Sequence, residues 1–259
     1  MVTVGGLLNY KDDIAYYEKL RKNVKESFNR QFFSPDSAYR SQTANVVALK
    51  YNLAEEKNRK FVLKALLDDV TEHDFHFTTG IQGAKHLYNV LSDNGYGDIA
   101  YKVLTNKTFP GIPYLFSLGA TTNWENWSNT ANTRGVPRSK NHPMNTGFAT
   151  WFYESLAGIK TDPSFPAFKK IILEPDFSTG VEWVRASYES PYGEIASSWR
   201  KVDNKISWKI SVPANTVAEI NLKSGSVGPI NGEGKAFVRK IKKGRYLISP
   251  GKYNLEITE

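Results

Sequence analysis

The sequence contains no cysteine, which excludes a disulfide framework, a thiolate nucleophile and a zinc–thiolate site. No apolar run approaches the about 18 residues that a membrane-spanning helix requires, so we predict no membrane insertion. Residues 1–6 lack the basic and apolar stretches of a signal peptide, and the compartment therefore stays open. Apolar residues still make up 40% of the 259-residue chain, which is enough to build a packed core.

The charge is only moderately one-sided, with 34 Lys and Arg against 26 Asp and Glu. The excess is spread along the chain: residues 1–159 carry 18 basic and 15 acidic side chains, and residues 160–259 carry 16 and 11. The one dense basic cluster, residues 239–245, is short. A surface that follows a phosphate backbone requires several convergent basic groups, so we predict no nucleic-acid partner.

The period of the apolar pattern changes near residue 160. Before it, apolar residues recur at steps of three and four, which is typical of amphipathic helices. Six helices are expected in this part, at residues 14–32, 44–51, 63–70, 84–91, 98–105 and 148–159. Gly158 is expected at the C-terminal end of the last one.

After residue 160 the period shortens toward two, which is typical of half-buried strands. Seven strands are expected, at residues 181–188, 194–200, 206–212, 216–222, 236–241, 246–248 and 253–257. Helices followed by strands, without alternation, predict a multidomain chain that is first α and then an antiparallel β-sandwich. We place the domain boundary between residues 159 and 160, with a proline-containing linker at residues 160–167.

Residues 110–145 fit neither period, and long irregular segments inside a compact domain are often functional. Within them Glu125 lies between Trp124 and Trp127. Indoles stack on the apolar faces of sugar rings, and a carboxylate beside them can act as general acid or base at a glycosidic bond. The alternative is a structural ion pair of Glu125 with Arg134 or Arg138.

His142 precedes Pro143, close to the helix that we expect to begin near Asn145. From this place it can hydrogen-bond a substrate hydroxyl or orient a carboxylate, or it can be a loop histidine bonded to the backbone. The other three histidines, His73, His76 and His86, lack the spacing of a metal site. We therefore predict neither a metal nor a cofactor.

Several motifs resemble those of the α-L-rhamnosidases of glycoside hydrolase family 78. The segment 119–125, Gly-Ala-Thr-Thr-Asn-Trp-Glu, resembles the family's "GATT-x-WE" signature, and residues 139–142, Ser-Lys-Asn-His, resemble its "S-x-NH" stretch. Residues 41–44 and 76–80 resemble segments that open two of the family's barrel helices. Residues 171–175, 190–193 and 212–216 resemble its closing β-sandwich.

This resemblance implies a partial (α/α)6 toroid over residues 1–159, followed by a β-sandwich over residues 160–259. It implies that Glu125 is the general base of an inverting hydrolysis of terminal α-L-rhamnosyl bonds. It further implies that His142 contacts the bound rhamnose and that Trp124 helps to wall the site. The expected substrate is a rhamnose-containing glycan or glycoside.

The sequence also departs from the family. The acidic motif that carries the family's general acid is absent, and about six helices are visible where a complete toroid has twelve. We therefore expect a fragment of a longer enzyme, inactive on its own, whose exposed toroid faces promote self-association.

Two other hypotheses remain open. One is a non-catalytic carbohydrate-binding or scaffolding protein whose sandwich binds glycans through Trp183, Trp199 and Trp208, although strand tryptophans are more often core residues. The other is an (α/α)6 hydrolase or lyase of different specificity.

Overall fold

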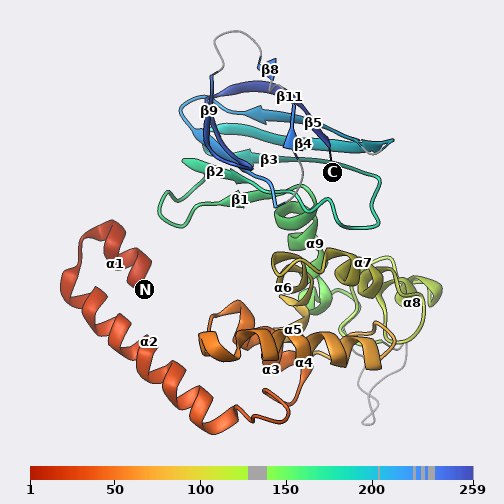
Figure 1. The fold of residues 1–259 in the computed structure, drawn as a ribbon. Coiled ribbons are helices and arrows are strands. Elements are labelled where there is room, and N and C mark those ends of the chain that lie inside the picture. Colours follow the sequence, from red (N-terminus) through yellow and green to blue (C-terminus); the bar gives the residue numbers. More distant parts are fainter. Residues whose placement is uncertain (128–138, 204, 224–225, 229–230, 233–236, 259) are drawn as a thin grey trace. The chain divides into compact units, whose positions relative to one another are not determined.

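The computed structural model describes residues 1–127, 139–203, 205–223, 226–228, 231–232 and 237–258. The chain divides into two compact units, Met1–Ala149 and Thr150–Glu259. The first unit is helical and the second consists of β-strands after a short helical entry (Figure 1). This order confirms the predicted fold class of helices followed by a β-sandwich.

The helical unit is built from short helices and one long one. Its elements are α1 (Val2–Leu8), α2 (Lys11–Phe32), α3 (Gln42–Lys50), the 3-10 turn η1 (Glu56–Asn58), α4 (Arg59–Glu72), α5 (Ile81–Ala84), α6 (Leu87–Asp93), α7 (Gly97–Thr105), α8 (Ile112–Ser117), the 3-10 turn η2 (Pro143–Asn145) and α9 (Gly147–Trp151). Helix α3 packs against α4, α5 and α6, so it lies at the centre of this unit. Its N-cap Ser41 accepts a hydrogen bond from the Ala44 amide at 3.2 Å.

The apolar periodicity located most of these helices, although α1 was not expected and two further segments differ. Residues 84–91 form parts of two helices rather than one, because the chain turns at Lys85 and His86 between α5 and α6. The segment 110–145 is not wholly irregular, since α8 lies inside it. That helix has only six residues, too short for its apolar residues to show a helical period.

Helix α2 leaves part of its apolar stripe in water. Leu20 is 43% exposed, Val24 is 50% exposed and Phe32 is 53% exposed. Asn29, near its C-terminal end, is buried and holds the helix to the rest of the unit. Its amide nitrogen donates to the Leu53 carbonyl at 2.8 Å, and its Oδ1 accepts from the Tyr39 hydroxyl at 2.6 Å.

The β unit contains two sheets. The first has the strand order β1 (Ile159–Thr161), β2 (Lys170–Leu173), β6 (Val217–Asn221), β10 (Arg245–Ile248) and β9 (Val238–Lys242). The second has the order β3 (Trp183–Ser190), β4 (Gly193–Val202), β5 (Lys205–Val212), β11 (Gly251–Thr258) and β7 (Ser226–Val227), and β8 (Asn231–Gly232) also pairs with β11. All these pairs are antiparallel except β2 with β6, which is parallel.

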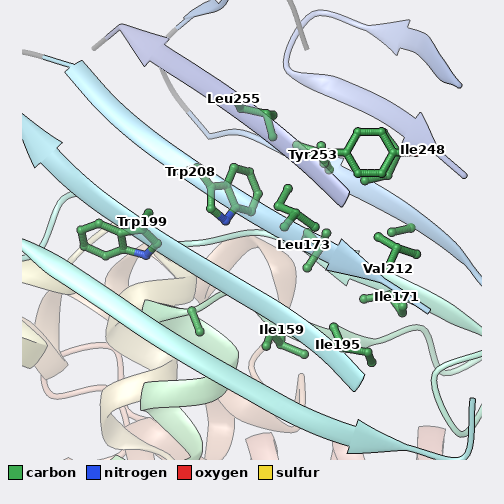
Figure 2. Close-up of a cluster of buried hydrophobic side chains, with 14 of the residues drawn as sticks. Ile159, Ile171, Leu173, Ile195, Trp199, Trp208, Val212, Ile248, Tyr253 and Leu255 are labelled. Atoms are coloured by element: carbon green, nitrogen blue, oxygen red, sulfur yellow. The ribbon is translucent and has the colours of Figure 1, made fainter. Parts of the chain in front are cut away.

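Alternate residues of both sheets form the core between them. Strand β5 alternates between exposed and buried positions along most of its length, which is the pattern that the sequence predicted. Figure 2 shows the core, in which Trp199 and Trp208 lie among aliphatic side chains of both sheets. Their indole nitrogens are satisfied, because Trp199 donates to the Leu156 carbonyl at 2.7 Å and Trp208 to the Ser197 hydroxyl at 2.9 Å. These two tryptophans are therefore core residues.

The entry to the β unit differs from the expected long helix. Helix α9 ends at Trp151 and continues as one π-helical turn, η3 (Phe152–Leu156), and Ile159 already belongs to β1. Gly158 follows the C-cap residue Ala157 with φ +73°. A Cβ atom there would lie 2.2 Å from the Pro175 nitrogen, so only glycine fits this helix-to-strand turn.

None of the helices in the described ranges is long and apolar enough to cross a membrane.

Candidate active site

Two segments that are separated in sequence run side by side at the predicted site. The Glu125 amide donates to the Ser139 carbonyl at 3.0 Å, and the His142 amide donates to the Asn123 carbonyl at 2.8 Å. The Thr122 hydroxyl donates to the Lys140 carbonyl in the same region. These bonds bring the Trp-Glu motif and the Asn-His motif onto neighbouring stretches of backbone.

The carboxylate of Glu125 is oriented by this pairing. Its Oε2 accepts a hydrogen bond from the Ser139 amide at 3.1 Å. Glu125 and Ser139 are therefore joined by two hydrogen bonds, since the Glu125 amide also donates to the Ser139 carbonyl. Glu125 and His142 are both partly exposed. The Asn141 amide in turn donates to the Ser139 hydroxyl at 3.2 Å, a bond within the second motif. The proposed partners Arg134 and Arg138 lie outside the described residues.

Trp124 is the anchor of this loop. It is 5% exposed and packs in a small apolar cluster with Leu115 of α8 and Ala120. The Lys140 ammonium lies 4.9 Å from the centre of its ring, a cation–π contact that joins the two segments a second time. The buried indole therefore anchors the loop. That Trp124 also lines the substrate site stays a prediction.

Trp127 connects the loop to the beginning of α5. Its ring meets the edge of the Phe77 ring at 4.8 Å between centroids, and Phe77 is buried. Phe77 belongs to the segment 76–80 that leads into α5. The neighbouring Thr78 amide donates to the Gln42 Oε1 at 3.0 Å, and the Gly80 amide donates to the Thr43 hydroxyl at 3.1 Å.

Gln42 lies in the segment 41–44 that resembles a family motif, but the sequence did not predict its supporting role. It is 1% exposed, and its amide nitrogen donates to the Asp69 carboxylate at 2.9 Å while its oxygen holds Thr78. Gln42 thereby joins the N-terminus of α3 to the segment before α5. A buried amide with satisfied donors and acceptors is a strong positional constraint, but the sequence shows only a polar residue at a helix start.

The helix after His142 packs closely on α5. A Cβ atom on Gly147 would lie 2.3 Å from the Ala84 carbonyl oxygen, so the first residue of α9 has to be glycine for this approach. Asn145 in η2 is 3% exposed. The region before α9 is therefore fixed from both sides, by the loop pairing at His142 and by the contact with α5.

The other histidines lie in different settings. His73 and His76 are bonded to backbone carbonyls at 2.8 Å each, and Tyr51 contacts His86 Nε2 at 2.9 Å. Burial, with help from Lys50 and Lys85, lowers the pKa of His86. Within the described ranges, no group of three or more His, Asp or Glu side chains is arranged to hold a metal ion.

Comparison with known protein families matches both units. Residues 1–156 match the family described as the bacterial alpha-L-rhamnosidase 6 hairpin glycosidase domain. Residues 158–237 match the bacterial alpha-L-rhamnosidase C-terminal domain.

Individual relatives agree with this match. An alpha-L-rhamnosidase of Formosa agariphila is 32% identical over 249 residues, which cover 91% of this chain and 26% of that protein. The solved alpha-L-rhamnosidase of Dictyoglumus thermophilum is 30% identical with a TM-score of 0.84, over 100% of this chain and 30% of its own. The Streptomyces avermitilis alpha-L-rhamnosidase, solved in complex with L-rhamnose, is 26% identical with a TM-score of 0.81, over 95% of this chain and 24% of its own. The chain thus spans about a quarter of these relatives' length.

Proposed function

The chain belongs to the bacterial α-L-rhamnosidase family, and from this membership we propose that it supplies the general base of an inverting α-L-rhamnosidase. Because the chain covers 26% of the Formosa agariphila relative, the activity is that of a longer enzyme that includes the preceding part of the toroid. In this proposal the substrate is a terminal α-L-rhamnosyl group of a glycan or glycoside.

The observation that carries the proposal is the pairing of the segments that hold Glu125 and His142. The two motifs are separated by more than a dozen residues, yet backbone hydrogen bonds at Ser139 and His142 keep them adjacent. The Ser139 amide also holds one oxygen of the Glu125 carboxylate. A sugar hydrolase needs a base and a hydroxyl-binding group, and this backbone pairing brings the segments of an oriented carboxylate and of a histidine together.

The proposed chemistry is a single displacement at the anomeric carbon. Glu125 takes a proton from a water molecule as its oxygen attacks the face opposite the leaving group, while a general acid protonates the leaving oxygen. In inverting enzymes the two carboxyl groups lie about 6.5–9.5 Å apart to accommodate that water. We assign the acid to the part of the enzyme that precedes this chain, because no matching acidic motif occurs in these 259 residues.

In this assignment His142 binds a hydroxyl group of the rhamnose and so fixes the sugar relative to Glu125. Trp124 anchors the loop that carries the Glu125 carboxylate. Its cation–π contact with Lys140 holds this loop to the segment that carries His142. Holding reactants in an attack geometry can contribute as much as the proton transfer itself, and small displacements are costly.

Chemical rescue in the longer enzyme tests the base assignment. We expect Glu125→Ala to lower kcat on an aryl α-L-rhamnoside by about 10²–10⁴-fold, because the attacking water loses its proton acceptor. Added azide needs no deprotonation, so it is expected to restore turnover and to yield the rhamnosyl azide of inverted configuration. Proton NMR identifies the anomer of that product.

Glu56→Gln is the matched control, since Glu56 is an exposed carboxylate in η1, and it should behave as wild type. If azide fails to rescue Glu125→Ala while the variant still binds rhamnose, the base lies elsewhere. Retention of configuration in the wild-type product would exclude the inverting mechanism.

A further inference from the structure

The second sheet carries the one exposed tryptophan of the six in the chain, Trp183 on β3. It is 57% exposed, whereas Trp199 and Trp208 on the next two strands are buried (Figure 2). A ring that remains largely in water gains little free energy from folding, because that gain is proportional to the area removed from water. The contribution of Trp183 to folding stability therefore does not explain why a tryptophan occupies this position.

Strand pairing surrounds Trp183 with polar side chains. Trp183 pairs with Arg200, and Trp199 pairs with both Val184 and Trp208, so the core residues and Trp183 point to opposite faces of the sheet. Two rows of residues cross β3, β4 and β5 on the outer face, namely Trp183, Arg200 and Ser207, and Arg185, Ser198 and Lys209. These six residues line an open cleft of about 530 Å³, which we call the Trp183 groove.

The cations of the Trp183 groove have no counter-ions in the part of the chain that the structure describes. Arg185, Arg200 and Lys209 are all exposed, and none of them takes part in an ion pair with a described carboxylate. Elsewhere on the same face Lys205 is paired with Glu256 at 2.9 Å. The groove is therefore a local concentration of positive charge around one aromatic ring.

A second cleft extends the groove along β3. It has a volume of about 800 Å³, shares Trp183, Arg185 and Ser198 with the first, and continues to Phe152 and Tyr153. Both of these rings are partly in water, with exposures of 40% and 44%. The combined surface has aromatic rings at two places, and its positive charge is concentrated in the first cleft, because the second is also lined by Glu194.

We propose that the Trp183 groove, which shares no residue with the proposed active site, binds an acidic oligosaccharide. The apolar face of a sugar ring stacks on the Trp183 indole, and the ring hydroxyls bond with Ser198 and Ser207. Carboxylate or sulfate groups of the glycan pair with Arg185 and Arg200, whose planar guanidinium groups match such anions in a bidentate way.

Two other kinds of ligand fit less well. A stable protein interface needs a contiguous apolar core, whereas the lining around Trp183 mixes two serines and three basic side chains with the apolar Val184, Trp199 and Val202. A neutral glycan would stack on the indole but would leave the three cations without a counter-charge. The acidic oligosaccharide is the ligand that uses both the ring and the charge.

Isothermal titration of the 259-residue chain with tetragalacturonate tests the proposal, with the neutral maltotetraose in parallel. We expect saturable binding of the acidic tetramer that weakens as salt is added, and clearly weaker binding of the neutral one. Trp183→Ala should lower the affinity by about tenfold or more, and Trp183→Phe should keep most of it. Arg185→Gln should lower it by about threefold and flatten the salt dependence.

Lys252→Ala is the matched charge control, because Lys252 is exposed on the same face but lies on β11, away from the groove. It should leave the affinity unchanged. Absence of saturable binding at millimolar tetragalacturonate overturns the proposal. So does equal affinity of Trp183→Ala and wild type, equal affinity for the neutral tetramer, or an equal effect of Lys252→Ala and Arg185→Gln.

Discussion

Glu125 and Ser139 hold each other by two hydrogen bonds, one in each direction. The Glu125 amide donates to the Ser139 carbonyl at 3.0 Å, and the Ser139 amide donates to the Glu125 carboxylate at 3.1 Å. A residue with no chemistry of its own thus orients the proposed base, and it does so through its backbone rather than its side chain.

Removal of the Ser139 amide hydrogen should impair turnover in the longer enzyme. We expect Ser139→Pro to lower kcat by about 10- to 100-fold with a smaller change in KM, because the carboxylate loses its orientation. Ser139→Ala keeps the amide and should retain near-normal kcat. Steady-state kinetics on an aryl rhamnoside measure both, and equal losses in the two variants would exclude the backbone role.

Truncation of Trp124 and of Trp183 should change the free energy of unfolding by very different amounts, because the first side chain is 5% exposed and the second 57%. Trp124→Ala opens a cavity in the cluster with Leu115 and should cost about 3–5 kcal/mol of unfolding free energy. Trp183→Ala should change the free energy of unfolding by less than about 0.5 kcal/mol. Urea unfolding followed by far-UV circular dichroism compares them, and similar costs would contradict the observed burial.

The ion-pair network at Glu219 should make the β unit acid-sensitive. Glu219 is 4% exposed on β6 and is bound by Arg245 and by Lys170, the latter at 3.0 Å. Burial acts to raise its pKa, but the hydrogen bonds from Arg245 and Lys170 outweigh it, and the pKa of Glu219 lies below its usual value of 4.5. The stability from this carboxylate is therefore present above about pH 4.5 and lost as the pH falls through the lowered folded-state pKa.

We accordingly expect Glu219→Ala to cost about 2–4 kcal/mol at pH 7 and progressively less below pH 4. Lys205→Ala, which breaks the exposed pair with Glu256, should leave the stability nearly unchanged at every pH. Unfolding midpoints measured from pH 7 to pH 3 separate the two variants. A Glu219→Ala cost that does not change with pH would show that the network acts through packing alone.

Gly147 should tolerate no side chain. Gly147→Ala places a Cβ atom 2.3 Å from the Ala84 carbonyl oxygen, a backbone atom that cannot rotate away, so α9 has to shift from α5. We expect a loss of about 2 kcal/mol or more. Gly80→Ala, whose Cβ would meet nothing within 4 Å, should stay near wild type. Thermal unfolding of the two variants gives the comparison.

The exposed stripe of α2 should drive self-association of the isolated chain. Leu20 and Val24 present apolar surface that is 43% and 50% exposed, and apolar area of this kind favours contact with another surface. Light scattering after size-exclusion chromatography is expected to show dimers or larger species. The double change Leu20→Gln and Val24→Gln should shift them to monomer, whereas Arg21→Gln should not. A wild-type monomer at all concentrations would disprove the expectation.

Much of the fold could be read from residue periodicity because burial on one face imposes it. The stripes of α3, α4 and α7 and the alternation along β4 and β5 each follow from one side facing a core, whereas the stripe of α2 is partly in water. The short helix α8 and the short strand β1 left no such trace, since elements of a few residues contain fewer than two full repeats of the pattern. The π-helical turn at Phe152–Leu156 was not predicted, because apolar residues at steps of three and four do not distinguish one such turn from a continuing α-helix.

The candidate site was visible in sequence as two motifs, Trp-Glu at 124–125 and Asn-His at 141–142, because residue types carry the chemistry. Their adjacency was not visible, since it results from backbone hydrogen bonds at Ser139 and His142 across a long loop. The sequence likewise supplied three strand tryptophans but not their directions. The register of β3 against β4 alone puts Trp183 in water and Trp199 in the core, because a pleated strand turns successive side chains to opposite faces.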